Sequence, residues 1–223
     1  MEAATTRPVE PKSRVAALAG GFVSMFPDLN AEKRRVAVQT YRLLARGGPV
    51  GREELAEAAG VSLSRLNEML DGWSGIFYEE EAIIGFWGLT PRPFSKHLFA
   101  VEGRTLYAWC AWDTLFMPRI LGKTAQVEST DPETGSIVRM TVTPDEVHSI
   151  EPSAAVMSIL EPKDDMMEDL VSRLCHFIYF FPSREIGEAW AARNPGCTLL
   201  TVQEGFELGR LKNEDQFGEA LRD

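Results

Sequence analysis

The sequence predicts an α+β protein, in which a helical N-terminal part precedes a core of antiparallel β-strands with surrounding helices. Before Ile76, apolar residues recur at helical spacing, and from Ile76 onward short β-rich runs are punctuated by Gly, Pro and Asp. The stretch DPETG at 131–135 separates two of these runs and is typical of a hairpin turn, because Gly135 tolerates a positive φ.

Composition and charge narrow the class of protein. The 223 residues are 44% hydrophobic and 25% charged, which is typical of a globular chain. Three widely spaced cysteines favour free thiols in a reducing compartment. Because the N-terminus lacks a signal-like apolar run and no 18 consecutive residues are apolar, we expect a soluble, cytoplasmic protein with no membrane partner. The net charge is −10, and the acidic excess lies in residues 123–223.

The helical part is organised by caps and glycines. Residues 1–14 are expected to form a loose arm, and residues 15–26 a short helix that ends before Pro27. Asn30 is placed to cap a helix that ends at the Gly-Gly-Pro of 47–49. Two further helices are expected over 51–72, with Gly60 at the turn between them and Ser62 as the second cap.

Helix, turn, helix and then a strand-like segment at 76–89 outline a winged helix. The second helix of the pair offers Arg65 and Asn67 against Glu68, which is too little positive charge for a phosphate-binding face. We therefore expect a structural role for this region and no nucleic-acid partner.

The β-rich part consists of short runs with two helices between them. One helix is expected after Cys110 and another over about 183–193. The run 173–181 is apolar enough to predict a strand packed on both faces. The remaining strand-like runs are 76–89, 96–103, 104–110, 124–130, 136–144, 155–162 and 197–202.

Two cysteines are candidates for chemistry. Cys110 and Asp113 are three residues apart, so on a helix both face the same way, and the helix N-terminus would favour a thiolate. The alternative is a buried small residue and a first-turn charge. Cys175 is more typical of packing, and its neighbour His176 would point to the opposite face of a strand. If the two thiols converge, they would form a dithiolate site for a soft metal.

The stretch YAWCAWDTL at 107–115, with PRILGKTA at 118–125, resembles the signature of the organomercurial lyases (alkylmercury lyases) of bacterial mercury resistance. GFWGLT at 85–90, VTP at 142–144 and the segment from Cys175 to Phe181 add to this resemblance, which runs from about residue 33 to 210. It implies a winged-helix-like subdomain over 31–90 that does not bind DNA and an alkylmercury lyase catalytic core over 91–223. The arm and short helix expected over 1–30 lie outside the resemblance.

The resemblance also implies roles for individual residues. Cys110, Asp113 and Cys175 match the catalytic residues and would hold the Hg(II) product, while Trp109 would line a water-poor substrate pocket. The implied reaction is protonolysis of the carbon–mercury bond. Cys110 captures the organomercurial with help from Asp113, Cys175 adds a second sulfur, and Asp113 returns a proton to carbon. No cofactor is expected, and Hg(II) would pass to cellular thiols or a mercuric reductase.

Some positions depart from the family pattern. Residues 128–131 lack a cysteine that some members carry, and Cys197 matches no known role. Cys175 is aligned by counting back from Phe180-Phe181, and a shift of one residue would put His176 in its place. The alternative function is a winged-helix regulator or sequestering protein that binds mercury through both cysteines without cleaving the bond. Preference for alkyl or aryl mercurials and the oligomeric state stay open.

Overall fold

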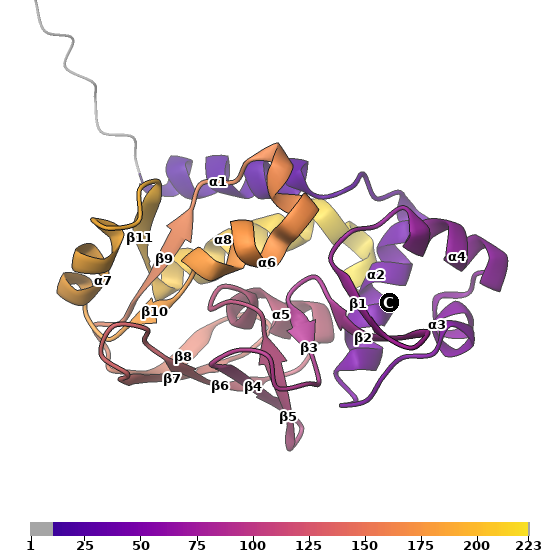
Figure 1. Cartoon of the computed structure of the whole chain (residues 1–223), viewed down its shortest axis with the longest axis horizontal. Coiled ribbons are helices and arrows are strands. Elements are labelled where there is room, and N and C mark those ends of the chain that lie inside the picture. Colours follow the sequence, from indigo (N-terminus) through magenta and orange to yellow (C-terminus); the bar gives the residue numbers. More distant parts are fainter. Residues whose placement is uncertain (1–10, 223) are drawn as a thin grey trace, which may run out of the picture.

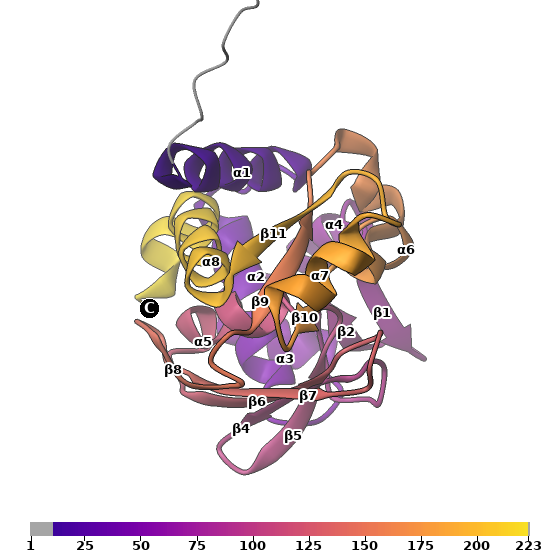
Figure 2. The ribbon, with the colours of Figure 1, turned by 90° about the vertical axis from the view of Figure 1, so that its left-hand side faces the viewer.

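The computed structural model describes residues 11–222 (Figure 1). Helix α1 (Pro11–Met25) lies beside α8 (Val202–Phe217), as both views show (Figure 1 and Figure 2). Because the chain is already helical at Pro11, the expected loose arm over 1–14 is wrong for its last four residues. The other ten lie outside the described residues. No described helix has the length and apolar character needed to cross a membrane.

Three helices follow α1 in the order expected. Their caps are those read from the sequence: the Asn30 side chain accepts from the Lys33 N–H, and the Ser62 side chain accepts from the Arg65 N–H. Gly60 ends α3 with a φ of 66°, a left-handed conformation that favours glycine. The helices are α2 (Ala31–Leu44), α3 (Arg52–Ala59) and α4 (Leu63–Asp71).

The larger sheet has eight strands in the order β1-β2-β3-β5-β4-β6-β7-β8, and every neighbouring pair is antiparallel. The predicted hairpin joins β6 to β7, with Gly135 at a φ of 73°. Strand β8 was not among the predicted runs. The strands are β1 (Ile76–Glu79), β2 (Ala82–Phe86), β3 (Leu89–Thr90), β4 (His97–Val101), β5 (Arg104–Ala108), β6 (Ala125–Thr130), β7 (Ile137–Val142) and β8 (Val147–Glu151).

A smaller antiparallel sheet has the order β10-β9-β11. Figure 2 shows α7 (Arg184–Ala191) beside it, and this helix begins where its Ser-Arg-Glu start predicts. The continuous strand expected over 173–181 is wrong: the segment contains the end of a helix, a 3-10 turn and only two strand residues. The elements are β9 (Val156–Leu160), η1 (Asp164–Asp169), α6 (Leu170–Arg173), η2 (Cys175–Phe177), β10 (Phe180–Phe181) and β11 (Cys197–Thr201).

Helices α5 (Asp113–Leu121) and α8 pack against each other. The sequence reading did not include α8, although Thr201 and Glu204 form a complete capping box at its start. The chain ends with a short 3-10 turn, η3 (Gly218–Leu221). One continuous buried cluster joins side chains of α1, α2, α5, α8 and both sheets, so the core extends through the N-terminal helices. The fold is therefore a mixed α and β structure with antiparallel sheets.

Candidate active site

The Cys110–Asp113 segment is a tight turn between β5 and α5. The helix begins at Asp113, so Cys110 lies outside its first turn, and the expectation that both residues share a helix face is wrong. A different contact brings them together: the Cys110 N–H donates to Asp113 Oδ2 at 2.7 Å. The thiol and the carboxylate are thus fixed on the same side of the turn. Cys110 is 1% exposed and Asp113 6%.

Cys175 reaches the same place from the 3-10 turn η2. The Ala111 N–H donates to the Ile178 carbonyl at 3.2 Å, which joins the two loops directly. The hydroxyl of Ser158 on β9 donates to the Phe177 carbonyl at 2.9 Å and supports the second loop from behind. The two sulfurs and a carboxylate oxygen of Asp113 all lie within 4.8 Å of one another. Two segments more than 60 residues apart therefore build one buried thiol–carboxylate cluster.

Neither neighbouring candidate belongs to the cluster, although His176 lines the same cavity as Cys175. His176 is exposed, so the buried position beside Cys110 belongs to Cys175 and not to the residue after it. Cys197 is half-buried on β11, where its Sγ lies 4.0 Å from the Phe177 carbonyl oxygen. Burial raises the pKa of the Cys197 thiol to about 11, which makes it a poor nucleophile near neutral pH.

The cluster holds its protons tightly. Burial raises the pKa of the Asp113 carboxyl to about 7, against the hydrogen bonds from Cys110 that lower it. Burial also raises the pKa of the Cys110 thiol well above its usual value, and its hydrogen bond to Cys175 raises it further. The expectation that a helix N-terminus favours the Cys110 thiolate is therefore wrong. Cys175 accepts this hydrogen bond, which lowers its pKa, but burial and the nearby Asp113 carboxylate together leave the pKa of the Cys175 thiol above its usual value.

The backbone of Gly88 packs directly against the Asp113 carboxylate. It has a φ of 106°, and a Cβ at this position would lie 2.5 Å from Asp113 Oδ1. Its carbonyl accepts from the Trp109 N–H at 2.7 Å, next to Cys110. Tyr41 on α2 donates its hydroxyl proton to the Trp87 carbonyl at 2.7 Å. The Asp113 carboxylate thus packs against the backbone of Gly88, and the Tyr41 side chain of α2 helps to hold that backbone in place.

A cavity of about 300 Å³ reaches the cluster at Cys175. Trp109, the residue expected in the substrate pocket, does line it. The sequence reading missed His97 and Tyr179. Alternation along β4 places His97, Phe99 and Val101 on its buried side, which was a usable signal. The lining includes Phe94, His97, Trp109, Val171, Cys175 and Tyr179.

His97 is an uncharged member of this wall. Its Nδ1 lies 2.6 Å from Ser129 Oγ on the neighbouring strand β6. Burial lowers the pKa of the His97 imidazole to about 4, so the ring is neutral near pH 7. The histidine therefore adds no positive charge to the cavity.

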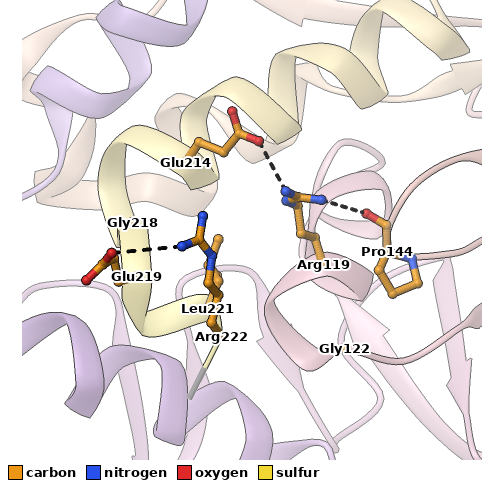
Figure 3. A pocket seen from close by; sticks show the side chains of 8 residues that line it. All are labelled: Arg119, Gly122, Pro144, Glu214, Gly218, Glu219, Leu221 and Arg222. Carbon is orange, nitrogen blue, oxygen red and sulfur yellow. Dashed lines mark hydrogen bonds and ion pairs between the residues drawn. The ribbon is translucent and has the colours of Figure 1, made fainter.

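A larger cavity of about 530 Å³ lies between α5, α8 and the chain end (Figure 3). Its charges pair with one another: Arg119 contacts Glu214 at 3.1 Å, and Arg222 contacts Glu219 at 3.8 Å. None of the three cysteines lines it. It offers neither a soft ligand nor an unbalanced charge, so we do not assign the chemistry to it.

A buried lysine lies on the α8 side of α5. Lys212 is fully buried, and its Nζ lies 4.2 Å from the ring centroid of Phe116 and 5.0 Å from those of Phe26 and Phe217. Within residues 11–222, this ammonium has no hydrogen-bond partner. Burial lowers the pKa of Lys212 to about 7. Phe116 lies one helical turn after Asp113, which places the lysine in the second layer behind the cluster.

Comparison with known proteins agrees with this geometry. The alkylmercury lyase family model matches residues 89–212. An alkylmercury lyase of Staphylococcus epidermidis is 38% identical over 76% of this chain and 77% of its own length. An alkylmercury lyase of Pseudomonas putida is 40% identical over 78% of this chain and 81% of its own. The crystal structure of the mercury-bound form of MerB2 shares the fold, with a TM-score of 0.71 and 20% identity over 94% of this chain and 99% of that one. On these matches, the chain belongs to the alkylmercury lyase family.

Proposed function

We propose that the protein is an enzyme that cleaves the carbon–mercury bond of organomercurials and releases a hydrocarbon and Hg(II). The observation that carries this proposal is the buried cluster of Cys110, Asp113 and Cys175, with all three donor atoms within 4.8 Å. Thiolates are the soft ligands that bind mercury, and a carboxyl group between them supplies a proton. Family membership agrees with this chemistry.

The reaction needs electron donation before proton transfer, because the carbon bound to mercury is a weak base. We place Cys175 first, since it lines the cavity and accepts the hydrogen bond of Cys110. Its thiolate displaces the outgoing ligand of R–Hg–X and forms an S–Hg bond. This order reverses the one expected from the sequence, in which Cys110 makes the first capture.

Cys110 and Asp113 complete the cleavage. The Asp113 carboxylate takes the Cys110 thiol proton, and the new thiolate adds a second sulfur to mercury. Asp113 then delivers this proton to carbon, the Hg–C bond breaks, and R–H leaves. The balance is R–Hg–X plus two thiols giving R–H, HX and Hg(II) held by two thiolates. A carboxyl pKa of about 7 suits both halves of this proton transfer.

Protonolysis leaves the oxidation state of mercury unchanged, so the proposed reaction needs no redox cofactor. Asp113 would complete the site of the Hg(II) product beside the two sulfurs, and Trp109 would keep water from it. The product would leave to cellular thiols or to a mercuric reductase. Free thiols at Cys110, Cys175 and Cys197 suit a reducing compartment, which we propose to be the cytoplasm.

We propose that residues 31–90 form a winged-helix-like cover for the site, not a DNA-binding module. On α4, the exposed Arg65 pairs with Glu32 at 3.0 Å and with Glu68 at 2.8 Å, so its charge is already balanced. Asn67 accepts from Arg52 at 2.7 Å. The polar groups that a recognition helix would offer to DNA are thus engaged within the protein.

The test is hydrocarbon release by the purified protein in excess small thiol. Phenylmercuric and methylmercuric salts are supplied separately, and benzene or methane is measured by gas chromatography. We expect release by the wild type and loss of release in Cys110→Ala and Cys175→Ala. Cys197→Ala is the matched control, because this thiol lies outside the cluster and should leave the rate unchanged.

Mercury bound per chain is measured on the same samples by mass spectrometry. Tight mercury binding without any hydrocarbon would make the protein a sequestering or sensing protein. A gel shift on DNA at low salt would then separate these two classes. Full activity of Cys175→Ala would reject the two-thiol mechanism while leaving a lyase in place.

A further inference from the structure

The turn between β2 and β3 carries the backbone that packs against Asp113. Phe86 and Leu89 pair across it, so Trp87 and Gly88 form a two-residue hairpin turn. Both turn residues have positive φ angles, 36° and 106°. Such a turn favours glycine, asparagine or aspartate at its first position, because a bulky side chain is strained there. The local sequence therefore does not explain why a tryptophan occupies this turn.

Contacts from two other segments hold the turn in this conformation. The backbone N–H of Trp87 donates to the Gly75 carbonyl at 3.1 Å, and its indole Nε1–H donates to the Ser74 carbonyl at 2.8 Å. The Tyr41 hydroxyl, from α2, donates to the Trp87 carbonyl at 2.7 Å. A strained backbone conformation persists where its surroundings fix it. These hydrogen bonds therefore set the position of the turn.

Tyr41 is a well-fixed donor. It is fully buried, and its ring lies 5.2 Å from that of Phe86 and 6.3 Å from that of Phe217. Burial, together with the nearby charges of Asp113 and Cys175, raises the pKa of the Tyr41 hydroxyl well above its usual value, so it keeps its proton. Its helix, α2, contacts β2, β3 and α5, which places it between the turn and the helix that begins at Asp113.

The turn in turn limits where the Asp113 carboxyl can lie. A Cβ on Gly88 would lie 2.5 Å from Oδ1 and 2.9 Å from Oδ2, so this backbone lies against both oxygens. The Cys110 N–H holds Oδ2 at 2.7 Å. A buried carbonyl that loses its donor is destabilising until the backbone shifts toward another partner. Loss of the Tyr41 hydroxyl should therefore loosen the surface against which the carboxyl packs.

We propose that Tyr41 is a positioning residue for cleavage of the carbon–mercury bond, because its hydrogen bond to the Trp87 carbonyl fixes the turn that holds the Asp113 carboxyl beside the two sulfurs. This inference rests on the proposed lyase function. It gives the N-terminal helices a part in turnover beyond covering the site. Tyr41 lines neither the cavity nor the cluster, so mercury capture by Cys175 should not depend on it.

The test is Tyr41→Phe, which keeps the packed ring and removes only the hydroxyl. The kcat for hydrocarbon release in excess thiol should fall about tenfold, less than the ~10²-fold that a 1 Å misplacement of a reacting group can cost. KM and mercury bound per chain should stay at wild-type values, because both thiols are unchanged. A wild-type kcat, or a raised KM with kcat unchanged, would overturn the inference and leave the lyase in place.

Thr40→Val is the matched control on the same helix. The Thr40 hydroxyl is also buried, but it donates to the Val36 carbonyl at 2.8 Å and not to the turn. Thermal melting establishes that both variants are folded at the assay temperature. We expect Thr40→Val to keep the wild-type kcat. Equal losses of kcat in the two variants would assign the effect to a general loosening of the core and overturn the inference.

Two further variants test the turn itself. Trp87→Phe removes the indole donor to Ser74 without changing α2, so it applies even where Tyr41→Phe is unstable, and its kcat should also fall. A wild-type kcat in Trp87→Phe would show that the position of the turn does not affect turnover. Tyr41→Phe combined with Gly88→Ala should lose no more activity than Gly88→Ala alone, because both changes act on one carboxyl. Losses that multiply would overturn the inference. Absence of hydrocarbon from the wild type with both phenylmercury and methylmercury would instead overturn the proposed function.

Discussion

Asp113 and Lys212 are buried ionisable groups on two helices that pack together, and burial moves both pKa values to about 7. The acid rises from 3.8 and the base falls from 10.5, since in both cases the charged form loses its water. Their surroundings differ. Asp113 accepts a backbone hydrogen bond at 2.7 Å and has two thiols within 4.8 Å. The Lys212 Nζ has aromatic rings around it and no hydrogen-bond partner among residues 11–222, and the charge of Asp113 raises its pKa against the larger effect of burial.

This difference separates Asp113, which belongs to the proposed active site, from Lys212, whose burial only destabilises the fold. The Asp113 carboxyl lies next to the Cys175 thiol, which lines a cavity, so a substrate bound there can accept the carboxyl proton. Lys212 does not line the cavity that reaches Cys175. The contacts of its ammonium with aromatic rings only partly replace the hydration that it loses on burial. A shifted pKa therefore marks function here only where neighbouring groups and access accompany it.

The largest effect is expected from Asp113→Asn, which keeps the shape of the side chain and removes the proton donor. Hydrocarbon release should fall by about 10²–10⁴-fold, the usual contribution of a general acid. Mercury binding should persist, because both thiols remain. Unchanged release would reject the proposed proton transfer.

The same variant has a signature in stability. A carboxyl whose folded pKa is raised to about 7 binds more protons in the folded than in the unfolded state between pH 4 and 7. The free energy of unfolding of the wild type therefore falls as the pH rises from 4 to 7, because the buried Asp113 carboxyl loses its proton. Asp113→Asn should gain free energy of unfolding relative to wild type over pH 4–7, as measured by urea denaturation. A constant difference across these pH values would contradict the buried carboxyl.

Gly88→Ala should give the second largest effect. A Cβ here would lie 2.5 Å from Asp113 Oδ1, and the φ of 106° strains any residue other than glycine. The carboxylate must move, and a displacement of about 1 Å costs up to ~10²-fold in rate. Steady-state benzene release measures this loss. Gly103→Ala is the matched control, since Gly103 also has a positive φ, 76°, but nothing lies within 4 Å of its Cβ. Equal losses in both variants would show that backbone strain, not the carboxylate contact, is responsible.

Local patterns made parts of this molecule predictable from sequence. The caps at Asn30 and Ser62 and the hairpin glycine at 135 are short-range signals, and the structure has all three. The pairing of Cys110 with Asp113 was expected for the wrong reason. The contact comes from a backbone N–H in a turn before the helix, not from helical spacing.

Long-range features were harder to read. The Cys175 segment looked like a strand because its residues are apolar, yet it is buried as a 3-10 turn against β9 and the Cys110 loop. Tertiary packing decided its conformation. Helix α8 has no clear hydrophobic pattern, because its buried face contains the polar residues Lys212, Asn213 and Gln216. Burial of these polar residues depends on contacts with segments far away in the sequence, which a local pattern does not contain.

Lys212→Met should have the smallest effect on turnover and a clear effect on the free energy of unfolding. A base whose folded pKa is lowered to about 7 binds fewer protons in the folded state between pH 7 and 10.5. Wild-type stability therefore rises with pH across this range, and the full penalty applies below pH 7. Methionine fills the same space without a charge. The variant should be more stable by roughly 1–4 kcal/mol at pH 6, with a smaller gain at pH 9, in urea denaturation.

Lys123→Met is the matched control, because Lys123 is exposed and pairs with Glu102 at 2.6 Å. It should change stability far less, and with no such pH trend. Benzene release should persist in Lys212→Met, since the lysine lines neither the cavity nor the cluster and its charge contributes less to the pKa of Asp113 than burial and the Cys110 hydrogen bonds do. A gain at pH 6 that persists in full at pH 9 would assign the effect to packing rather than charge. Loss of release with retained mercury binding would place Lys212 inside the functional site, and the contrast with Asp113 would no longer hold.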